Sequence, residues 1–557
     1  MKRKSAIISL LLLSSVLTPL NAQNYVSQVW NPDNGNGTYT NPVINADYSD
    51  PDVIAVGDDY YLTASSFQCM PGLPILHSKD LVNWEIIGHA LTKPYFSQNV
   101  PSHGNGVWAP CMRYHNGEFY IYWGDPDRGV YMVKTKNPAG EWEKPVRVIK
   151  GKGMIDTSPL WDDDGRCYLV NGWANSRAHF ASVLTVRELN AEGTAAISDP
   201  VIVFDGNGTE NRTCEGPKFY KRNGWYWIMC PAGGVPTGFQ LAMRSKSPYG
   251  PYEVKKVLAQ GKTNINGPHQ GGWVHTSQGE DWFMHFQDKG AYGRVVHLQP
   301  VTWRDNWPVM GIDKDGDYCG EPVTKYRKPK TAGKVANVNP QESDEFNDGK
   351  VGMQWQWQAN YSQLYGMPTM NGTFRLYTYK LKPYTYKKNR DSLSLWLDPA
   401  MLLQKTPADR FTATAKLCLT AKNEQQFGGI IMMGLNFSAL VVKRVGQEFQ
   451  LLQLTCKDAD KANQPTSKLL ATLKPTSADT NGYQEAIHEA IYMRMKVYDG
   501  KLQFAYSTDG KHFTNVGDVF TMREGKWIGA KIGLVAAEPQ GTNPCGWIDV
   551  DWFRITR

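Results

Sequence analysis

GEFYIYW, at residues 117–123, is one of five related stretches in the first 300 residues of the 557-residue chain. Each copy follows a turn and opens an apolar strand with bulky side chains. The second bulky residues of the copies are Tyr61, Tyr120, Tyr168, Tyr226 and Phe283, giving spacings of 59, 48, 58 and 57 residues. Repeats of this length, each holding about four short strands, are typical of propeller blades. The pattern predicts a five-bladed β-propeller, the alternative being two sandwiches with chance similarity.

The amino-acid composition changes at residues 325–343, KYRKPKTAGKVANVNPQES. This segment is basic, contains proline and is poor in aromatic residues, which is typical of an exposed linker. Beyond it, alternating stretches such as GGIIMMGL (428–435) and YMRMKVYD (492–499) predict antiparallel strands. The 52 Gly, 33 Pro and 66 aromatic residues (19 Trp, 28 Tyr, 19 Phe) also favour short strands joined by turns. We therefore expect an all-β chain whose domains are a propeller (23–325), a linker (326–343) and a concanavalin-like β-sandwich (344–557).

The N-terminus has the features of a secretory signal peptide. Residues 1–22 carry three basic residues directly after Met1, continue with an apolar run and end in small residues near Ala22. The first cysteine is Cys69, so no lipid-acceptor cysteine follows the expected cleavage site. The formal charge of +7 falls to +4 without the leader (60 − 3 − 53), which calls for no nucleic-acid partner. We expect export without a membrane anchor, to the periplasm or to the medium, and the oligomeric state stays open.

Three carboxylates stand out in Pro-containing segments that precede predicted strands of different blades. They are Asp50 in ADYSDPDV, Asp156 in GMIDTSPLW and Glu215 in RTCEGPKFY. Inner strands of a propeller surround one axis, so side chains far apart in sequence converge at one end of the channel. Glycoside hydrolysis needs one protonated carboxyl as acid and one carboxylate as base. A third carboxylate can raise the pKa of the acid by like-charge repulsion.

These segments, together with HSKDLVNWEIIGHAL (77–91) and VWAPCMRYHNGEFYIYWG (107–124), resemble glycoside hydrolase family 43. The C-terminal stretches SDEFND (343–348) and WIDVDWFRITR (547–557) are similar to the sandwich of its xylosidase-like members. The family acts on α-L-arabinofuranosides and β-D-xylosides and inverts anomeric configuration. The resemblance implies that Asp50 is the general base, Asp156 the pKa modulator and Glu215 the general acid. It further implies that a loop of the sandwich closes one side of the pocket.

The same resemblance implies several substrate contacts. Phe67 and Trp108 correspond to aromatic walls of the sugar pocket, and Arg294 to an arginine that contacts sugar hydroxyls. Many members place a Gly-His-Gly histidine on the axis near calcium. In GPHQGGW, aligning the glycines puts Gln270 there instead of His269. We retain His269 as a candidate substrate-binding residue. No cofactor is required, and a structural calcium ion is left open.

The preferred function is an exo-acting, inverting hydrolase that releases terminal α-L-arabinofuranosyl groups from hemicellulose oligosaccharides, such as arabinoxylan or xyloglucan side chains. A β-D-xylosidase, or an enzyme with both activities, is the second reading. A non-catalytic carbohydrate-binding protein is a remote alternative, since a binder has no need of three converging acids. A retaining fructan- or sucrose-active enzyme is less favoured. The acidic stretches DDDG (162–165) and DKDGD (313–317) are interpreted as turns between strands.

Overall fold

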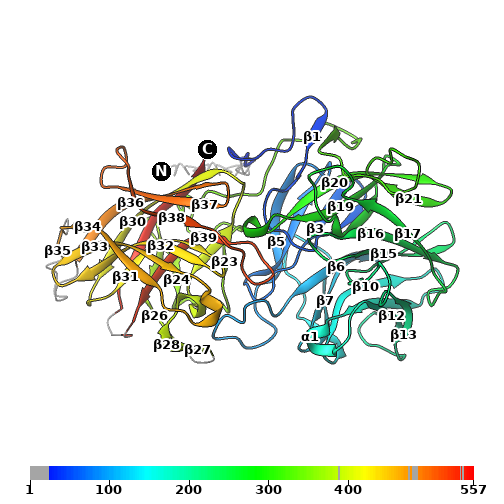
Figure 1. Cartoon of the computed structure of the whole chain (residues 1–557), viewed down its shortest axis with the longest axis horizontal. Coiled ribbons are helices and arrows are strands. Elements are labelled where there is room, and N and C mark those ends of the chain that lie inside the picture. The colour runs from blue at the N-terminus through cyan, green and yellow to red at the C-terminus, as the bar shows by residue number, and fades with distance from the viewer. Residues whose placement is uncertain (1–23, 387–388, 475–476, 479–486, 540, 542–544) are drawn as a thin grey trace, which may run out of the picture.

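The computed structural model describes residues 24–386, 389–474, 477–478, 487–539, 541 and 545–557. The predicted signal peptide at residues 1–22 lies outside these residues. Figure 1 shows two β domains side by side, the first coloured blue to green and the second yellow to red. The prediction of an all-β chain with a five-bladed propeller and a concanavalin-like sandwich is confirmed.

Each blade is a four-stranded antiparallel sheet whose strands follow chain order. Blade 1 comprises β2 (Asp52–Val56), β3 (Asp59–Thr63), β4 (Gly72–Ser78) and β5 (Trp84–Leu91). Blade 2 comprises β6 (Trp108–His115), β7 (Glu118–Asp125), β8 (Gly129–Thr135) and β9 (Val146–Lys150). Blade 3 comprises β10 (Met154–Trp161), β11 (Cys167–Trp173), β12 (Val183–Leu189) and β13 (Val201–Asp205).

Blade 4 comprises β14 (Lys218–Arg222), β15 (Trp225–Ala232), β16 (Phe239–Ser245) and β17 (Glu253–Ala259). Blade 5 comprises β18 (His269–His275), β19 (Asp281–Asp288), β20 (Arg294–Arg304) and β21 (Trp307–Met310). The five repeats found in the sequence fall on the second strand of each blade. Their alternating bulky side chains fill the layers between blades; Tyr122 and Trp123, for example, are both fully buried on β7.

An ionic and hydrogen-bonded network joins the inner strands at the propeller axis. Asp52, which is fully buried on β2, accepts hydrogen bonds from Arg113 Nη1 at 2.9 Å and from the Met112 backbone N–H at 2.7 Å. Arg113 also donates to Ser158 Oγ of blade 3 at 2.8 Å and to the Phe219 carbonyl of blade 4. One guanidinium therefore connects blades 1 to 4, and a buried charge is matched by an opposite charge.

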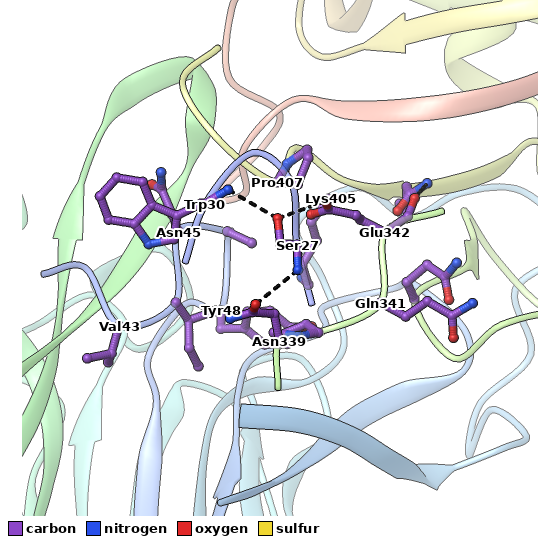
Figure 2. Close-up of a pocket in the computed structure, with 15 residues that line it drawn as sticks. Ser27, Trp30, Val43, Asn45, Tyr48, Asn339, Gln341, Glu342, Lys405 and Pro407 are labelled. Carbon is purple, nitrogen blue, oxygen red and sulfur yellow. Dashed lines mark hydrogen bonds between the residues drawn. The ribbon is translucent and has the colours of Figure 1, made fainter. Parts of the chain in front are cut away.

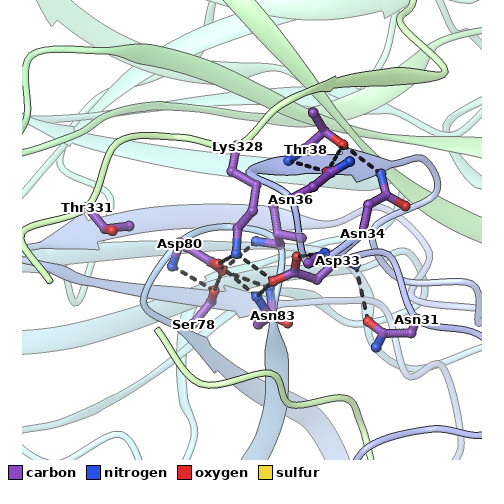
Figure 3. A network of polar contacts seen from close by, with 12 residues as sticks. Asn31, Asp33, Asn34, Asn36, Thr38, Ser78, Asp80, Asn83, Lys328 and Thr331 are labelled. Carbon is purple, nitrogen blue, oxygen red and sulfur yellow. Dashed lines mark hydrogen bonds and ion pairs between the residues drawn. The ribbon is translucent and has the colours of Figure 1, made fainter. Parts of the chain in front are cut away.

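The ring is closed by chain segments at its two ends. Strand β1 (Thr38–Thr40) pairs with β22 (Lys325–Arg327), on opposite sides of the five blades in sequence. Close by, Lys328 Nζ lies 2.6 Å from both Asp33 Oδ2 and Asp80 Oδ2 (Figure 3). Asn83 donates to the same two carboxylates. This polar cluster ties the end of the propeller to its beginning and to blade 1.

The second domain consists of two stacked, mainly antiparallel sheets that enclose one large apolar core. The first sheet contains β23 (Gln356–Trp357), β29 (Leu402–Lys405), β39 (Lys531–Glu538), β31 (Phe427–Met433), β32 (Phe437–Val445), β33 (Glu448–Cys456) and β34 (Thr466–Leu473), with β26 (Tyr379–Lys380) beside β39. The second contains β24 (Gly366–Pro368), β25 (Phe374–Tyr377), β40 (Trp547–Thr556), β30 (Phe411–Ala421), β36 (Ile487–Tyr498), β37 (Lys501–Ser507) and β38 (Thr514–Thr521), with β35 (Ser477–Ala478) beside β36.

Few helical turns interrupt the strands. Within the described residues these are α1 (Asn175–Ala178), η1 (Gly290–Tyr292), η2 (Leu395–Leu397) and η3 (Ala459–Lys461), and β27 (Pro383–Tyr386) pairs with β28 (Asn389–Leu393) as a separate hairpin. None of the described helices is long and apolar enough to cross a membrane.

The two domains are connected by many specific contacts. Met70 and Trp357 exchange backbone hydrogen bonds of 3.0 and 2.6 Å. Lys531 Nζ lies 3.0 Å from Cys69 Sγ, and both side chains are buried. The Gly529 N–H donates to Asp47 Oδ2 at 2.8 Å. These contacts fix the sandwich against the face of the propeller that carries the acids.

The N-terminal segment covers another part of the domain junction (Figure 2). Ser27 donates through its backbone N–H to Asn339 Oδ1 and through its hydroxyl to Glu342 Oε1. A cavity of about 500 Å³, open mouth included, lies beside these residues, and Trp30 and Lys405 line it. Burial raises the pKa of Glu342 to about 7. Residues before the first blade, in the linker and in the sandwich thus meet at one place.

The ion pair at the axis makes a specific stability prediction. Asp52→Ala leaves the Arg113 guanidinium buried without its carboxylate, and such a loss costs about 3–5 kcal/mol of the free energy of unfolding. Urea unfolding followed by tryptophan fluorescence measures the change. The double variant Asp52→Leu/Arg113→Met removes both charges and should recover a large part of the loss. Equal destabilisation by the single and the double variant would contradict the importance of the pairing.

Candidate active site

A pocket opens at the end of the propeller axis that faces the sandwich loop. Its volume is about 530 Å³, including the open mouth. Six of the seven site residues expected from the sequence line it: Asp50, Phe67, Trp108, Asp156, Glu215 and Arg294. Five further residues line it: Ala109, Ile155, Val235, Gln270 and Trp527. The three acids from blades 1, 3 and 4 therefore face one cavity, as the propeller geometry predicted.

Asp50 is surrounded by hydrogen-bond donors. Its Oδ2 accepts from the Ser49 and Ser65 hydroxyls at 2.7 and 2.6 Å, and its Oδ1 accepts from Arg294 Nη1 at 3.0 Å. Ser65 Oγ in turn accepts from the Ala109 N–H, which orients this hydroxyl. Two hydroxyls and a guanidinium stabilise an ionised carboxylate, which is the form that can take a proton from water.

Asp156 holds the backbone next to Glu215. Its Oδ2 accepts from the Gly216 N–H at 2.8 Å. Gly216 has φ +62°, and a Cβ there would lie 2.7 Å from Gln270 Cδ, so this position requires glycine. The carboxylate of blade 3 thereby fixes the residue that follows the acid of blade 4.

The acids influence one another's protonation. Desolvation, followed by the negative charge of Asp156, raises the pKa of Glu215 to about 8. Desolvation and the charge of Asp50 also raise the pKa of Asp156 above its ordinary range. About a third of the Glu215 side chain is exposed, so it can reach a ligand in the cavity. At neutral pH this arrangement keeps the Glu215 carboxyl protonated, which is the form that a general acid requires.

Backbone irregularities direct several side chains toward the cavity. Asp50, Phe67, Ala109, Asp156 and Gln270 all have positive φ, between 36° and 57°. The register of blades 2, 3 and 5 shifts at Trp108/Cys111, Ile155/Ser158 and His269/Gly271. Bulges next to active sites re-aim side chains and end regular pairing. The left-handed conformations mark this end of the axis as the functional one.

Aromatic side chains from both domains form one wall. The rings of Phe67 and Trp108 meet edge to face at 6.3 Å, and Trp108 and Trp527 do so at 6.0 Å. Trp527 belongs to the sandwich, on the segment between β38 and β39, and is half exposed with φ +67°. A bulky residue in this conformation costs energy, which the docking of its loop must offset. Sequence reasoning expected a sandwich loop here but did not identify the residue.

His269 lies behind the pocket instead of lining it. Its Nε2 is 3.8 Å from Glu215 Oε1, and the side chain is almost fully buried. Burial and the positive charge of Arg294 lower the pKa of His269 to about 3, so the imidazole is neutral and forms no ion pair with Glu215. The neighbouring Gln270 reaches the cavity, and its buried Nε2 has no hydrogen-bond partner in the described structure. The alignment of the glycines in GPHQGGW had already pointed to Gln270.

One group of acidic side chains in the described part of the chain is close enough to share a cation. It consists of Asp313, Asp315 and Asp317 in the DKDGD segment, none of which lines the pocket. Asp313 is already paired with Arg304 at 2.6 Å. The calcium ion that the resemblance allows remains a prediction.

The fold and the pocket together define a glycosidase built on a propeller, with paired acids at one end of the axis. Residues 39–308 match the glycosyl hydrolases family 43 profile, and residues 343–556 match the β-xylosidase C-terminal concanavalin A-like domain. The chain belongs to glycoside hydrolase family 43.

Relatives cover nearly the whole chain. A Xylanibacter ruminicola protein whose name contains the word beta-xylosidase is 34% identical, over 90% of this chain and 87% of its own. A beta-xylosidase of Formosa agariphila is 31% identical, over 94% and 90% of the two chains. The non-reducing end alpha-L-arabinofuranosidase BoGH43B of Bacteroides ovatus is 30% identical, over 93% and 94%. The structure of the K247S mutant of the GH43 protein BlXynB from Bacillus licheniformis superposes with a TM-score of 0.77 at 25% identity, covering 93% of this chain and 99% of that chain.

The pKa of Glu215 predicts the pH dependence of activity. An acid must be protonated, so kcat/KM should fall as the pH rises through about 8. Asp156→Asn removes a charge that raises this pKa while keeping an acceptor for the Gly216 N–H. The alkaline limb of the pH profile should therefore move to lower pH. The exposed Asp163→Asn, in the same blade, is the control and should leave the limb in place; an unmoved limb in Asp156→Asn would contradict the coupling.

The wall contributed by the sandwich can be tested separately. Trp527→Ala removes an aromatic face worth about 0.5–1.5 kcal/mol, so kcat/KM should fall up to about tenfold. Trp527→Phe should keep most of the activity. Steady-state kinetics measure both, with a thermal unfolding curve to verify that the domains remain folded. Unchanged kinetics in Trp527→Ala would show that this ring does not contact the substrate.

Proposed function

We propose that the chain is an exo-acting, inverting glycosidase that removes single terminal pentosyl residues from hemicellulose-derived oligosaccharides. The observation that carries the proposal is one pocket in which Glu215, Asp156 and Asp50 converge and Trp527 of the second domain closes a side. A pocket with such a wall suits a chain end better than the middle of a polymer. The α-L-arabinofuranosides and the β-D-xylosides are the two candidate substrate classes.

The proposed mechanism is a single displacement. Asp50, held by Arg294 and two hydroxyls, takes a proton from a water molecule as that water attacks the anomeric carbon. Glu215 donates its proton to the leaving oxygen, and its raised pKa supports this role at neutral pH. Asp156 keeps that pKa high and positions the backbone at Gly216. No covalent glycosyl intermediate forms.

The relatives support both substrate classes about equally. The Xylanibacter ruminicola and Formosa agariphila relatives carry names containing beta-xylosidase, and the Bacteroides ovatus relative is named a non-reducing end alpha-L-arabinofuranosidase. The two pentosyl groups present similar hydroxyl patterns to an arginine, a glutamine and an aromatic wall. We retain the arabinofuranoside as the first candidate and the xyloside as the second, and we propose that the enzyme acts in the periplasm after export.

The assignment of roles predicts different responses to leaving-group quality. Glu215→Ala should lose about 10²–10⁴-fold activity on an oligosaccharide, whose leaving group needs a proton, and much less on a 4-nitrophenyl glycoside. Asp50→Ala should lose activity on both, because every substrate needs an activated water. Initial rates on paired 4-nitrophenyl α-L-arabinofuranoside and β-D-xyloside also decide the preferred sugar. The exposed Glu210→Ala, in the same blade, is the matched control.

Two results would overturn the proposal. Equal losses by Glu215→Ala on good and poor leaving groups would remove its role as acid. A first product with retained anomeric configuration in the proton NMR spectrum would exclude single displacement.

A further inference from the structure

Two cysteines of blade 4 lie beside the residue that carries the acid. The Sγ atoms of Cys214 and Cys230 are 3.2 Å apart. Cys214 directly precedes Glu215, whereas Cys230 is in the interior of β15. The Glu215 N–H donates to the Pro231 carbonyl at 3.3 Å, so the two segments already run side by side here.

The two cysteines are enclosed by apolar side chains. Both side chains are buried, within a cluster that includes Val170, Phe219 and Leu241. In the described structure each of the two sulfurs forms its hydrogen bond with the other. Burial, with the nearby Cys230 as the next cause, raises the pKa of the Cys214 thiol well above its ordinary value. The mechanism above uses neither thiol.

We propose that Cys214 and Cys230 form a disulfide that fixes the segment carrying Glu215. The oxidant is a low-molecular-weight disulfide. One protein thiol loses its proton and displaces a small thiol, giving a mixed disulfide, and the second protein thiol then displaces the other small thiol. Two protein S–H bonds break, one S–S bond forms, and the small disulfide is reduced by two electrons to two thiols.

The geometry requires little movement. A disulfide bond is about 2.0 Å long, so the sulfurs must approach by about 1.2 Å, within the reach of side-chain rotation. The expected export would place the chain in a compartment where disulfides persist. Because the bond would be buried, small reductants would reach it slowly in the folded protein.

The bond would hold Glu215 from its N-terminal side. On the C-terminal side, Gly216 is already held by Asp156 through a 2.8 Å hydrogen bond. The general acid would then be fixed between a covalent bond at the preceding residue and a hydrogen bond at the following one. The two cysteines are positioning residues, since neither lines the pocket.

Peptide mapping tests the bond directly. Trypsin cleavage after Arg212 and Lys218 isolates TCEGPK, and cleavage after Arg222 and Arg244 isolates residues 223–244. After the reduced, denatured protein is refolded in the presence of oxidised glutathione, a non-reducing digest should contain these two peptides joined, and reduction of the digest should separate them. Two separate peptides, each alkylated at its cysteine after denaturation of the oxidised sample, would overturn the proposal.

Steady-state kinetics test whether the disulfide positions Glu215, a test that rests on the proposed role of Glu215 as the general acid. The protein refolded without an oxidant, which keeps both thiols, should have a severalfold lower kcat than the disulfide form on an oligosaccharide and nearly the same kcat on a 4-nitrophenyl glycoside. Cys214→Ser and Cys230→Ser should have the kinetics of the reduced enzyme whether or not oxidised glutathione is present. Cys167→Ser, which changes a buried cysteine of blade 3, is the control and should respond to the oxidant like the unmodified chain. Identical kinetics of the joined and the reduced forms would overturn the positioning effect. A protein without glycosidase activity would refute the proposed function, yet the peptide map would still decide the disulfide.

Discussion

The enclosure of three carboxylates in one small pocket is the constraint on which the arrangement of this propeller depends. Like charges in a poorly solvated cavity repel strongly, so they coexist only if some are neutralised by protons or by cations. Arg294 and two hydroxyls serve Asp50, whereas Glu215 and Asp156 respond with raised pKa values. The same repulsion that makes the site costly thereby favours the protonated form of Glu215, the proposed acid.

The network below the pocket explains why such a site can be held open. Asp52 lies two residues after Asp50, and its bond to Arg113 ties the inner strand of blade 1 to those of blades 2, 3 and 4. A propeller strand that carries an acid at its mouth is thus anchored at the axis by a buried ion pair. Closure of the ring through β1, β22 and Lys328 adds a second restraint, because blades 1 and 5 cannot separate without breaking these contacts.

Sequence reasoning recovered the parts of the structure that depend on local pattern. The paired bulky residues located all five second strands, and the Pro-containing acidic segments located Asp50, Asp156 and Glu215 in the pocket. It did not find Trp527, because nothing in its neighbourhood distinguishes it from a surface turn and its partner Trp108 is more than 400 residues away in the chain. The alignment of the flanking glycines pointed to Gln270. Its position in the cavity, however, depends on a β-bulge with a left-handed backbone, and no residue type in this segment predicts that bulge.

The sandwich contributes to the active site through its docking at the rim of the propeller, whereas the three acids all come from the propeller. Asp47, two residues before Ser49, receives the Arg294 N–H on one oxygen and the Gly529 N–H on the other. One carboxylate thus links the arginine that binds Asp50 with the sandwich segment that follows Trp527. Movement of the second domain would therefore disturb both the aromatic wall and the base. This shared anchor explains in physical terms why the two domains form one functional unit and why the pocket has a closed side.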